Sequence, residues 1–125
     1  MPRILLVDDE RDITIILKKG LNINGYEVDV FNDPREALSK FKPDYYFGVL
    51  SDVRMPAMSG FELCRKLVEI DSKLRVAFMS AYEIYEDQAR KTFPSLKTDC
   101  FIKKPVSIDY LVKRLESCMQ HAAAA

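Results

Sequence analysis

The stretch RILLVDDE, residues 3–10, joins a short run of apolar, mostly branched side chains directly to three carboxylates. The apolar part has the length and composition of a buried strand. Adjacent carboxylates repel one another, and the repulsion grows as water is removed from around them. The sequence therefore indicates either that Asp8, Asp9 and Glu10 spread into solvent or that a cation lies among them.

The composition is that of one ordinary globular domain. The chain has 125 residues, of which 48% are hydrophobic and 30% are charged, which suffices for one core and hardly for two. The 19 basic and 19 acidic side chains cancel, so no bulk field would gather nucleic acid or an anionic membrane. No apolar run is long enough to span a bilayer, and the N-terminus lacks the pattern of a signal peptide. We expect a cytoplasmic protein that binds neither nucleic acid nor a membrane directly.

The cysteines and the C-terminal residues give two further expectations. Cys64, Cys100 and Cys118 are odd in number and scattered, so we predict reduced thiols and neither a disulfide framework nor a zinc site. The four alanines that end the chain are of low complexity. We expect one domain over residues 1–120, followed by a tail or the start of a linker over residues 121–125.

Strand-like and helix-like patterns alternate along the chain. Strands are predicted over residues 3–7, 26–31, 46–51, 74–79 and 100–102. Helices are predicted after them: one that carries Ile13, Ile16, Leu17 and Leu21 and stops at Gly25, one capped by Asp33, one opened by Ser59 and Glu62, one over residues 83–93 and one capped by Ser107. This alternation predicts an α/β fold with a doubly wound, five-stranded parallel sheet and five helices. In such sheets the functional site lies beyond the carboxyl ends of the strands.

Chemically active side chains stand at those carboxyl ends. Asp8 and Asp9 follow the first predicted strand, Asp52 the third, Ser80 the fourth and Lys104 the fifth. Each alone is most often a turn former, a helix cap or a solvated side chain, but together they converge on one edge of the sheet. A set of oxygen ligands favours a hard cation, Mg²⁺ first and Mn²⁺ second. A carboxylate beside such an ion, a hydroxyl and a lysine can attack a phosphoryl group.

Four segments together resemble the receiver domain of two-component response regulators. They are VDDE at residues 7–10, LSDVRMPAMSG at 50–60, MSA at 79–81 and IKKP at 102–105. The resemblance extends from about Arg3 to about Met119. It implies the flavodoxin-like fold, with strand order 2-1-3-4-5. It also implies a phosphorylation-dependent signalling switch whose own reactions are limited to self-phosphotransfer and autodephosphorylation.

The resemblance assigns a role to each residue that matches the family pattern. It implies that Asp52 is the phosphoacceptor and that Mg²⁺ is held by Asp9, Asp52, the backbone carbonyl of Arg54 and, through water, Asp8. It implies that Ser80 and Lys104 bind the phosphoryl oxygens. It also implies that a cis peptide bond precedes Pro105 and that Phe101 is the switch residue. The switch is a phenylalanine, so it lacks the hydroxyl of the tyrosine that the family often has. The donor would be a phosphohistidine of a sensor histidine kinase or a phosphotransfer protein.

Phosphorylation is expected to act through Ser80 and Phe101. The hydroxyl would move to the phosphoryl group, and the ring would turn into the space that it leaves. The surface formed by the fourth and fifth strand–helix units would then change, and a partner or a second copy of the chain would bind there. We also expect Arg54 and Tyr82 to border the path of the hydrolytic water, and so to slow the loss of phosphate.

Three other interpretations were weighed against this one. The only glycines are Gly20, Gly25, Gly48 and Gly60, and they form neither a dinucleotide fingerprint nor a phosphate-binding loop. A Mg²⁺-dependent phosphohydrolase with an aspartyl-phosphate intermediate shares the chemistry, but it usually has an acid two residues beyond a nucleophile on its first strand. An interaction module without phosphorylation would have no need for this set of acids, hydroxyl and lysine.

Overall fold

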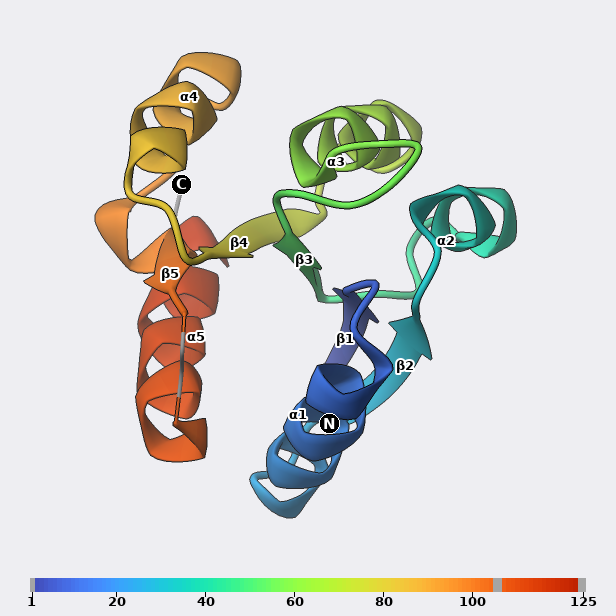
Figure 1. Ribbon diagram of the computed structural model, residues 1–125, viewed down its shortest axis with the longest axis vertical. Coiled ribbons are helices and arrows are strands. Elements are labelled where there is room, and N and C mark those ends of the chain that lie inside the picture. Colours follow the sequence, from blue (N-terminus) through green and yellow to red (C-terminus); the bar gives the residue numbers. More distant parts are fainter. Residues whose placement is uncertain (1, 105–106, 124–125) are drawn as a thin grey trace.

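Strands and helices alternate in the computed structural model, which describes residues 2–104 and 107–123 (Figure 1). The elements are β1 (Arg3–Val7), α1 (Arg11–Ile23), β2 (Glu27–Phe31), α2 (Pro34–Lys40), β3 (Gly48–Asp52), α3 (Gly60–Ile70), β4 (Arg75–Ser80), α4 (Ile84–Thr92), the short 3-10 helix η1 (Thr98–Cys100), β5 (Phe101–Lys103) and α5 (Ile108–Ala123). The strands are parallel and lie in the order β2-β1-β3-β4-β5. The predicted doubly wound fold and its strand order are confirmed.

The sheet separates two hydrophobic cores. Helices α1 and α5 cover one face, and α2, α3 and α4 cover the other (Figure 1). Strand β1 lies between β2 and β3, and its side chains alternate between the cores, with Ile4 and Leu6 in the first and Leu5 and Val7 in the second. All four are fully buried. A strand covered on both faces has no solvent side, so its sequence is continuously apolar and does not alternate.

Helix α1 buries a narrower face than the sequence predicted. Thr14, Leu17 and Leu21 are buried, and Ile13 packs against the same core. Ile16 was expected on this face, but it is 62% exposed. At roughly 100° per residue, the buried arc runs from Ile13 through Leu17 and Leu21 to Thr14. Ile16 therefore points about a third of a turn away from the centre of that arc.

The start of helix α3 is drawn tightly against the end of β3. Ser59 Oγ accepts a hydrogen bond from Glu62 N at 3.2 Å, as the capping pattern predicted. The backbone N–H of Gly60 donates to the carbonyl oxygen of Val53 at 2.8 Å. A β-carbon at position 60 would collide with the backbone carbonyl oxygen of Asp52. This close approach requires glycine, and it fixes the backbone that carries Asp52.

The prediction of reduced thiols is wrong for two of the three cysteines. Cys100 and Cys118 form a disulfide, with their Cα atoms 5.1 Å apart, whereas Cys64 is a free, buried thiol. The two bonded residues are 18 positions apart in the sequence. That spacing alone does not show that the end of η1 meets the last turns of α5. The reversal of the chain between β5 and α5 brings them together.

Three further expectations concern the C-terminal part of the chain and membranes. Pro105, for which a cis peptide bond was expected, lies outside the described residues. Helix α5 continues to Ala123, beyond residue 120, where we expected the domain to end. Within the described part of the chain, no helix combines the length and the apolar character that a membrane span requires.

We expect Gly60→Ala to lower the free energy of unfolding by about 1–3 kcal/mol, the usual cost of overpacking. The loss should occur although alanine is the better helix former by about 1 kcal/mol, because the new methyl group meets the Asp52 carbonyl oxygen. Urea unfolding measures the change. The control is Glu69→Ala, at an exposed position of the same helix, which should alter stability by less than about 0.5 kcal/mol. A Gly60→Ala protein as stable as the wild type would contradict the contact.

Candidate functional site

The carboxyl ends of β1, β3 and β5 bring two carboxylates and one ammonium group together. Asp8 directly follows β1, Asp52 is the last residue of β3, and Lys104 directly follows β5. Lys104 Nζ donates to Asp8 Oδ2 at 2.9 Å and lies 3.4 Å from Asp52 Oδ2. The backbone N–H of Lys104 also donates to the carbonyl oxygen of Ser80 at 2.9 Å. The edge of the sheet thus holds this lysine between the two acids.

These three side chains are largely removed from water. Their exposed fractions are 0% for Asp8, 10% for Asp52 and 14% for Lys104. Burial, and after it the charge of Asp8, raises the pKa of Asp52 to about 6, although Lys104 acts in the opposite direction. Burial alone would lower the pKa of Lys104, but the hydrogen bond to Asp8 and the charges of both acids outweigh burial and raise it. Ionising both acids beside a single lysine is therefore costly.

Glu10 is a third carboxylate at this site. One of its oxygens lies within 4.8 Å of carboxylate oxygens of Asp8 and Asp52, and Glu10 Oε1 is 3.8 Å from Lys104 Nζ. Three carboxylates face one ammonium group, which leaves an excess of negative charge. A hard dication with oxygen ligands, such as Mg²⁺, fits this donor set and would balance the charge.

Asp9 is placed differently from the other two acids of the run. It is exposed and lines a separate depression between the end of β2 and the start of α2. The family resemblance implied a metal-ligand role for Asp9 and none for Glu10. The turn after β1 makes the difference, since Glu10 N donates to Asp8 Oδ1 at 3.0 Å and the Glu10 side chain lies on the Lys104 side. An acidic run by itself does not show which of its members face the sheet edge.

The side chains two positions beyond Asp52 and Ser80 meet each other. The guanidinium carbon of Arg54 lies 5.8 Å from the centre of the Tyr82 ring, a distance typical of a cation–π contact. Both residues are exposed. They therefore form a pair that connects the loops after β3 and β4 next to Asp52.

Ser80 and Phe101 are buried, with exposed fractions of 3% and 4%. Ser80 Oγ accepts a hydrogen bond from Tyr82 N at 3.0 Å, so the hydroxyl is engaged with the loop that follows β4. Phe101 belongs to the core on the α3 side of the sheet, together with Phe61 and Phe78. Its ring lies in the interior in this structure, and its turn into the space that Ser80 would leave stays a prediction.

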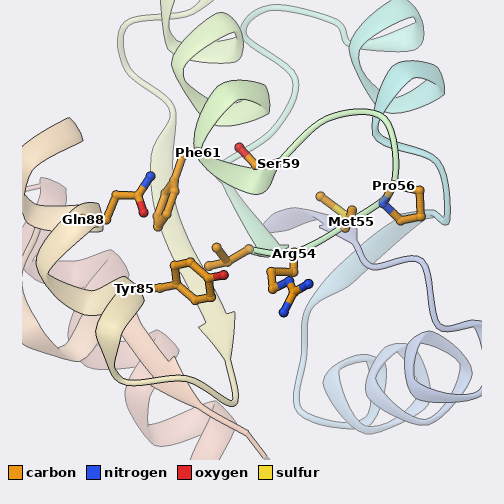
Figure 2. A pocket seen from close by; sticks show the side chains of 8 residues that line it. Arg54, Met55, Pro56, Ser59, Phe61, Tyr85 and Gln88 are labelled. Atoms are coloured by element: carbon orange, nitrogen blue, oxygen red, sulfur yellow. The ribbon is translucent and has the colours of Figure 1, made fainter.

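A cavity of about 460 Å³ opens beside the Asp52 strand end (Figure 2). Figure 2 shows Phe61 and Tyr85 on the side of α3 and α4, with Met55 and Arg54 on the loop after β3. The wall is mainly apolar, and the Arg54 guanidinium lies among its lining groups. The cavity leaves room beside the acidic site for an approaching side chain or small molecule.

We expect the metal-free protein to lose stability as the pH rises through about 6, and we expect Asp52→Asn to abolish this loss. The pKa of Asp52 is raised in the folded protein from 3.8 to about 6. Its stabilising contribution is therefore complete below 3.8 and is lost as the pH rises through about 6. At about 1.4 kcal/mol per pKa unit, Asp52→Asn should exceed the wild type by roughly 2–3 kcal/mol at neutral pH and by much less in mildly acidic buffer.

The measurement is urea unfolding in the presence of a chelator at several pH values. Asp44→Asn serves as the control, because Asp44 is exposed and has a φ of 59°, which asparagine tolerates. A stability difference between Asp52→Asn and the wild type that does not change with pH would contradict the shifted pKa.

Comparison with known proteins agrees with this geometry. The model of the response regulator receiver domain family matches residues 4–116. The response regulator MprA of Mycolicibacterium vanbaalenii is 30% identical over 118 residues, and the match covers 94% of this chain and 50% of MprA. The chain thus spans about half the length of that relative.

Solved structures of similar proteins have the same fold. The chemotaxis protein CheY4 of Vibrio cholerae superposes with a TM-score of 0.82 at 28% identity, covering 94% of this chain and 98% of CheY4. The response regulator TrrA of Thermotoga maritima, solved in complex with Mg²⁺ and BeF, has a TM-score of 0.78 at 30% identity and covers 94% of this chain and 99% of TrrA. The family match spans most of the chain, and the strand order and the acidic sheet edge agree with it. This chain belongs to the response regulator receiver domain family.

Proposed function

We propose that this domain is a phosphorylation-dependent switch in which Asp52 accepts a phosphoryl group from the phosphohistidine of a sensor histidine kinase or a phosphotransfer protein. One observation carries the proposal: the Asp52 carboxylate lies at the end of β3, among Asp8, Glu10 and Lys104. The structure of T. maritima TrrA with Mg²⁺ and BeF supports it, because beryllofluoride is a mimic of the phosphoryl group.

Different groups of the chain have different roles in the phosphoryl transfer. Asp52 Oδ1 accepts a hydrogen bond from Val53 N at 2.9 Å, which fixes the rotation of the carboxylate. One carboxylate oxygen attacks the phosphorus in line with the histidine nitrogen, which leaves with the electron pair of the broken P–N bond. Lys104 pairs with a phosphoryl oxygen as the acyl phosphate forms. Bound Mg²⁺, or Mn²⁺ in its place, neutralises the remaining phosphoryl charge.

We propose that Asp9, Asp52 and the backbone carbonyl of Arg54 hold the metal, with Asp8 acting through water. Glu10 lies closer to the cluster than Asp9, but its side chain is 60% exposed and 3.8 Å from Lys104 Nζ. It is therefore better placed to balance the lysine. Asp9 directly follows Asp8 in the chain, and turning an exposed aspartate to another rotamer costs little.

The switch would begin at Ser80. A phosphoryl dianion on Asp52 attracts the Ser80 hydroxyl, which now accepts a hydrogen bond from Tyr82 N. Turning toward the phosphate breaks that bond and moves the loop before α4. Phe101 lies in β5 beside β4, so the surface of α4, β5 and α5 would adjust with the loop. A downstream partner or a second copy of the chain would bind the altered surface.

The contact between Arg54 and Tyr82 supports a role in retaining the phosphate. Hydrolysis needs a water molecule in line with the Asp52–phosphorus bond, on the open side of the phosphoryl group. The guanidinium and the ring lie together, on the two loops that would border this side. Arg54 is also able to hydrogen-bond phosphoryl oxygens and hold them.

A Mg²⁺-dependent phosphohydrolase with an aspartyl-phosphate intermediate is the second candidate. The acidic site would serve both functions, but receiver domains are signalling switches, and this favours the first.

We propose that self-phosphotransfer and autodephosphorylation are the only reactions. We also propose that residues 1–120 form the receiver unit, with residues 121–125 as a tail or linker. It would act in the cytoplasm, where kinases draw on ATP, without binding nucleic acid or a membrane itself.

Acetyl phosphate with Mg²⁺ should add one phosphoryl mass to the wild type and none to Asp52→Asn, because the substitution removes the attacking oxygen. Intact mass spectrometry measures the addition. Asp44→Asn, an exposed acid before β3 and so at the opposite end of that strand from Asp52, should be labelled like the wild type. Label on Asp52→Asn would show that another residue accepts the phosphate. Multiple turnover of a small phosphate ester would instead favour the phosphohydrolase.

Mg²⁺ binding should weaken by at least about tenfold in Asp9→Ala, since a carboxylate that would bind the metal directly is lost. The matched variant Glu10→Ala should bind Mg²⁺ more tightly than Asp9→Ala does. An NMR titration of each protein with Mg²⁺ measures the affinities. If Glu10→Ala loses the metal and Asp9→Ala keeps it, the ligand is Glu10 and our assignment of Asp9 is wrong.

Phosphorylated Asp52 should decay at least about tenfold faster in Arg54→Asn with Tyr82→Glu, equivalent to about 1.4 kcal/mol of barrier. The double substitution removes the bulky pair and leaves groups that can orient water. Tyr82→Phe keeps the ring under Arg54 and should decay like the wild type. The measurement is the first-order loss of the phosphoryl mass in Mg²⁺ buffer. Equal decay in the double variant and the wild type would exclude shielding by this pair.

A further inference from the structure

The disulfide joins two elements of the surface that the switch would alter. Cys100 is the last residue of η1, directly before Phe101 in β5, and Cys118 lies toward the C-terminal end of α5. The bond is at the amino end of β5, whereas Lys104 and Asp52 lie at the carboxyl ends of their strands. It therefore belongs to a second region of the domain, separate from the acidic site.

A cavity of about 650 Å³ leads to the disulfide. Cys100 and Cys118 line it, together with apolar side chains that include Phe93 and Leu96. Its charged lining residues are Lys73, Arg75 and Lys97, and none of the described lining residues is acidic. Arg75 is held in place, because its Nε donates to the carbonyl oxygen of Met119 at 3.0 Å and its guanidinium lies over the Phe47 ring. Basic residues thus line a cavity whose wall includes both cysteines, which are largely buried.

We propose that Cys100 and Cys118 form a reversible dithiol–disulfide site that exchanges with an anionic, low-molecular-weight thiol and its disulfide. The basic rim of this cavity, formed by Lys73, Arg75 and Lys97, would attract the anionic reagent. The Cα atoms of the bonded pair are 5.1 Å apart, within the usual range for a disulfide.

The exchange balances as two displacements. One cysteine thiolate attacks a sulfur atom of the small disulfide, whose S–S bond breaks as one small thiolate leaves. The second cysteine thiolate attacks the protein sulfur of this mixed disulfide, and the second small thiolate leaves. The two cysteines lose two electrons, which the small disulfide gains, and their two protons pass to the small thiols. Reduction is the reverse sequence.

Cys64 provides an internal contrast. Like Cys100 and Cys118, which are 4% and 1% exposed, it is buried, but unlike them it does not line the cavity, and burial raises the pKa of its thiol. It should therefore remain a thiol while the other two cysteines exchange. In a reducing compartment, disulfides of this kind are usually transient and regulatory, which agrees with exchange through an open cavity.

A regulatory consequence rests on the proposed function. Arg114 of α5 donates to the carbonyl oxygens of Thr98 and Phe101 at 3.1 and 3.3 Å, and the disulfide adds a covalent link between the same elements. The oxidised form would hold α5 against η1 and β5 and limit the change that phosphorylation causes. Reduction would remove the covalent link and leave α5 held by hydrogen bonds and by its packing in the core.

The test follows the thiols of the folded protein in glutathione redox buffers, by acid quenching, alkylation and mass spectrometry. We expect a single transition between a dithiol and a Cys100–Cys118 disulfide, with Cys64 reduced throughout. Failure of this disulfide to form at any buffer ratio would overturn the proposal. So would a disulfide that glutathione reduces only after the protein is unfolded.

The role of the basic rim is tested by the rates at which two small disulfides oxidise the reduced protein. One is the anionic glutathione disulfide and the other is the cationic cystamine. In the double variant Lys73→Gln with Lys97→Gln, the ratio of the rate with glutathione disulfide to the rate with cystamine should fall at least about threefold. Lys18→Gln with Lys19→Gln, at exposed positions of α1, changes the net charge equally and should leave the ratio unchanged. An unchanged ratio in the cavity variant would overturn the selectivity for anions.

Treatment with acetyl phosphate and Mg²⁺ separates the two proposals. Thiol counting does not depend on phosphorylation, so a protein that takes up no phosphate in either redox state contradicts the proposed function alone. If phosphate is taken up, hydrogen exchange in α5 should change more in the reduced protein than in the oxidised one. An equal change in both states would overturn the regulatory consequence.

Discussion

The contact of Lys104 with Asp8 and Asp52 is the constraint on which the functional edge depends. Two buried carboxylates do not readily ionise side by side, because little water remains to screen them. Lys104 Nζ lies 2.9 Å from one and 3.4 Å from the other, and it offsets part of this cost. Glu10 adds to the excess of negative charge, which a dication and then a phosphoryl group would change in turn. The site is thus sensitive to added charge, because Lys104 does not fully compensate the charges of the carboxylates.

The topology explains why these groups meet. Asp8 and Asp52 come from the adjacent strands β1 and β3, and β4 separates them from the strand that precedes Lys104. The connection after β1 passes over one face of the sheet and the connection after β2 over the other (Figure 1). Such a change of face leaves the strand ends open to a ligand. Gly60 then allows α3 to start directly against the end of β3. This close approach fixes the backbone of Asp52.

Strand β5 connects the two chemistries that we propose. It has three residues, with Lys104 directly after it and Cys100 directly before it. Phe101 stands at its start and is buried in the core on the α3 side. A change of charge at one end and of covalent bonding at the other would therefore act on the same short strand. Because the interior is closely packed, small shifts there are passed on to the neighbouring helices.

The sequence by itself determined the architecture and most of the acidic edge. Alternating strand and helix patterns and local caps such as Ser59 are short-range features, so the fold and the strand order followed from them and from the family resemblance. Strand ends were predicted to within one or two residues, and β3, β4 and β5 extend one residue further than expected, to Asp52, Ser80 and Lys103. Because parallel strands end at a common edge, the placement of Asp52 near Lys104 followed from the same pattern.

Only the tertiary structure decided which side chains of a pattern face each other. It placed Glu10 at the acidic site, left Ile16 in solvent, and set the Arg54 guanidinium over the ring of a residue far along the chain. It also bonded Cys100 to Cys118, against the expectation of reduced thiols. Periodicity fixes the direction of a side chain only within its own element. The meeting of separate elements depends on how helices pack on the sheet, and that packing is set by contacts between residues distant in sequence.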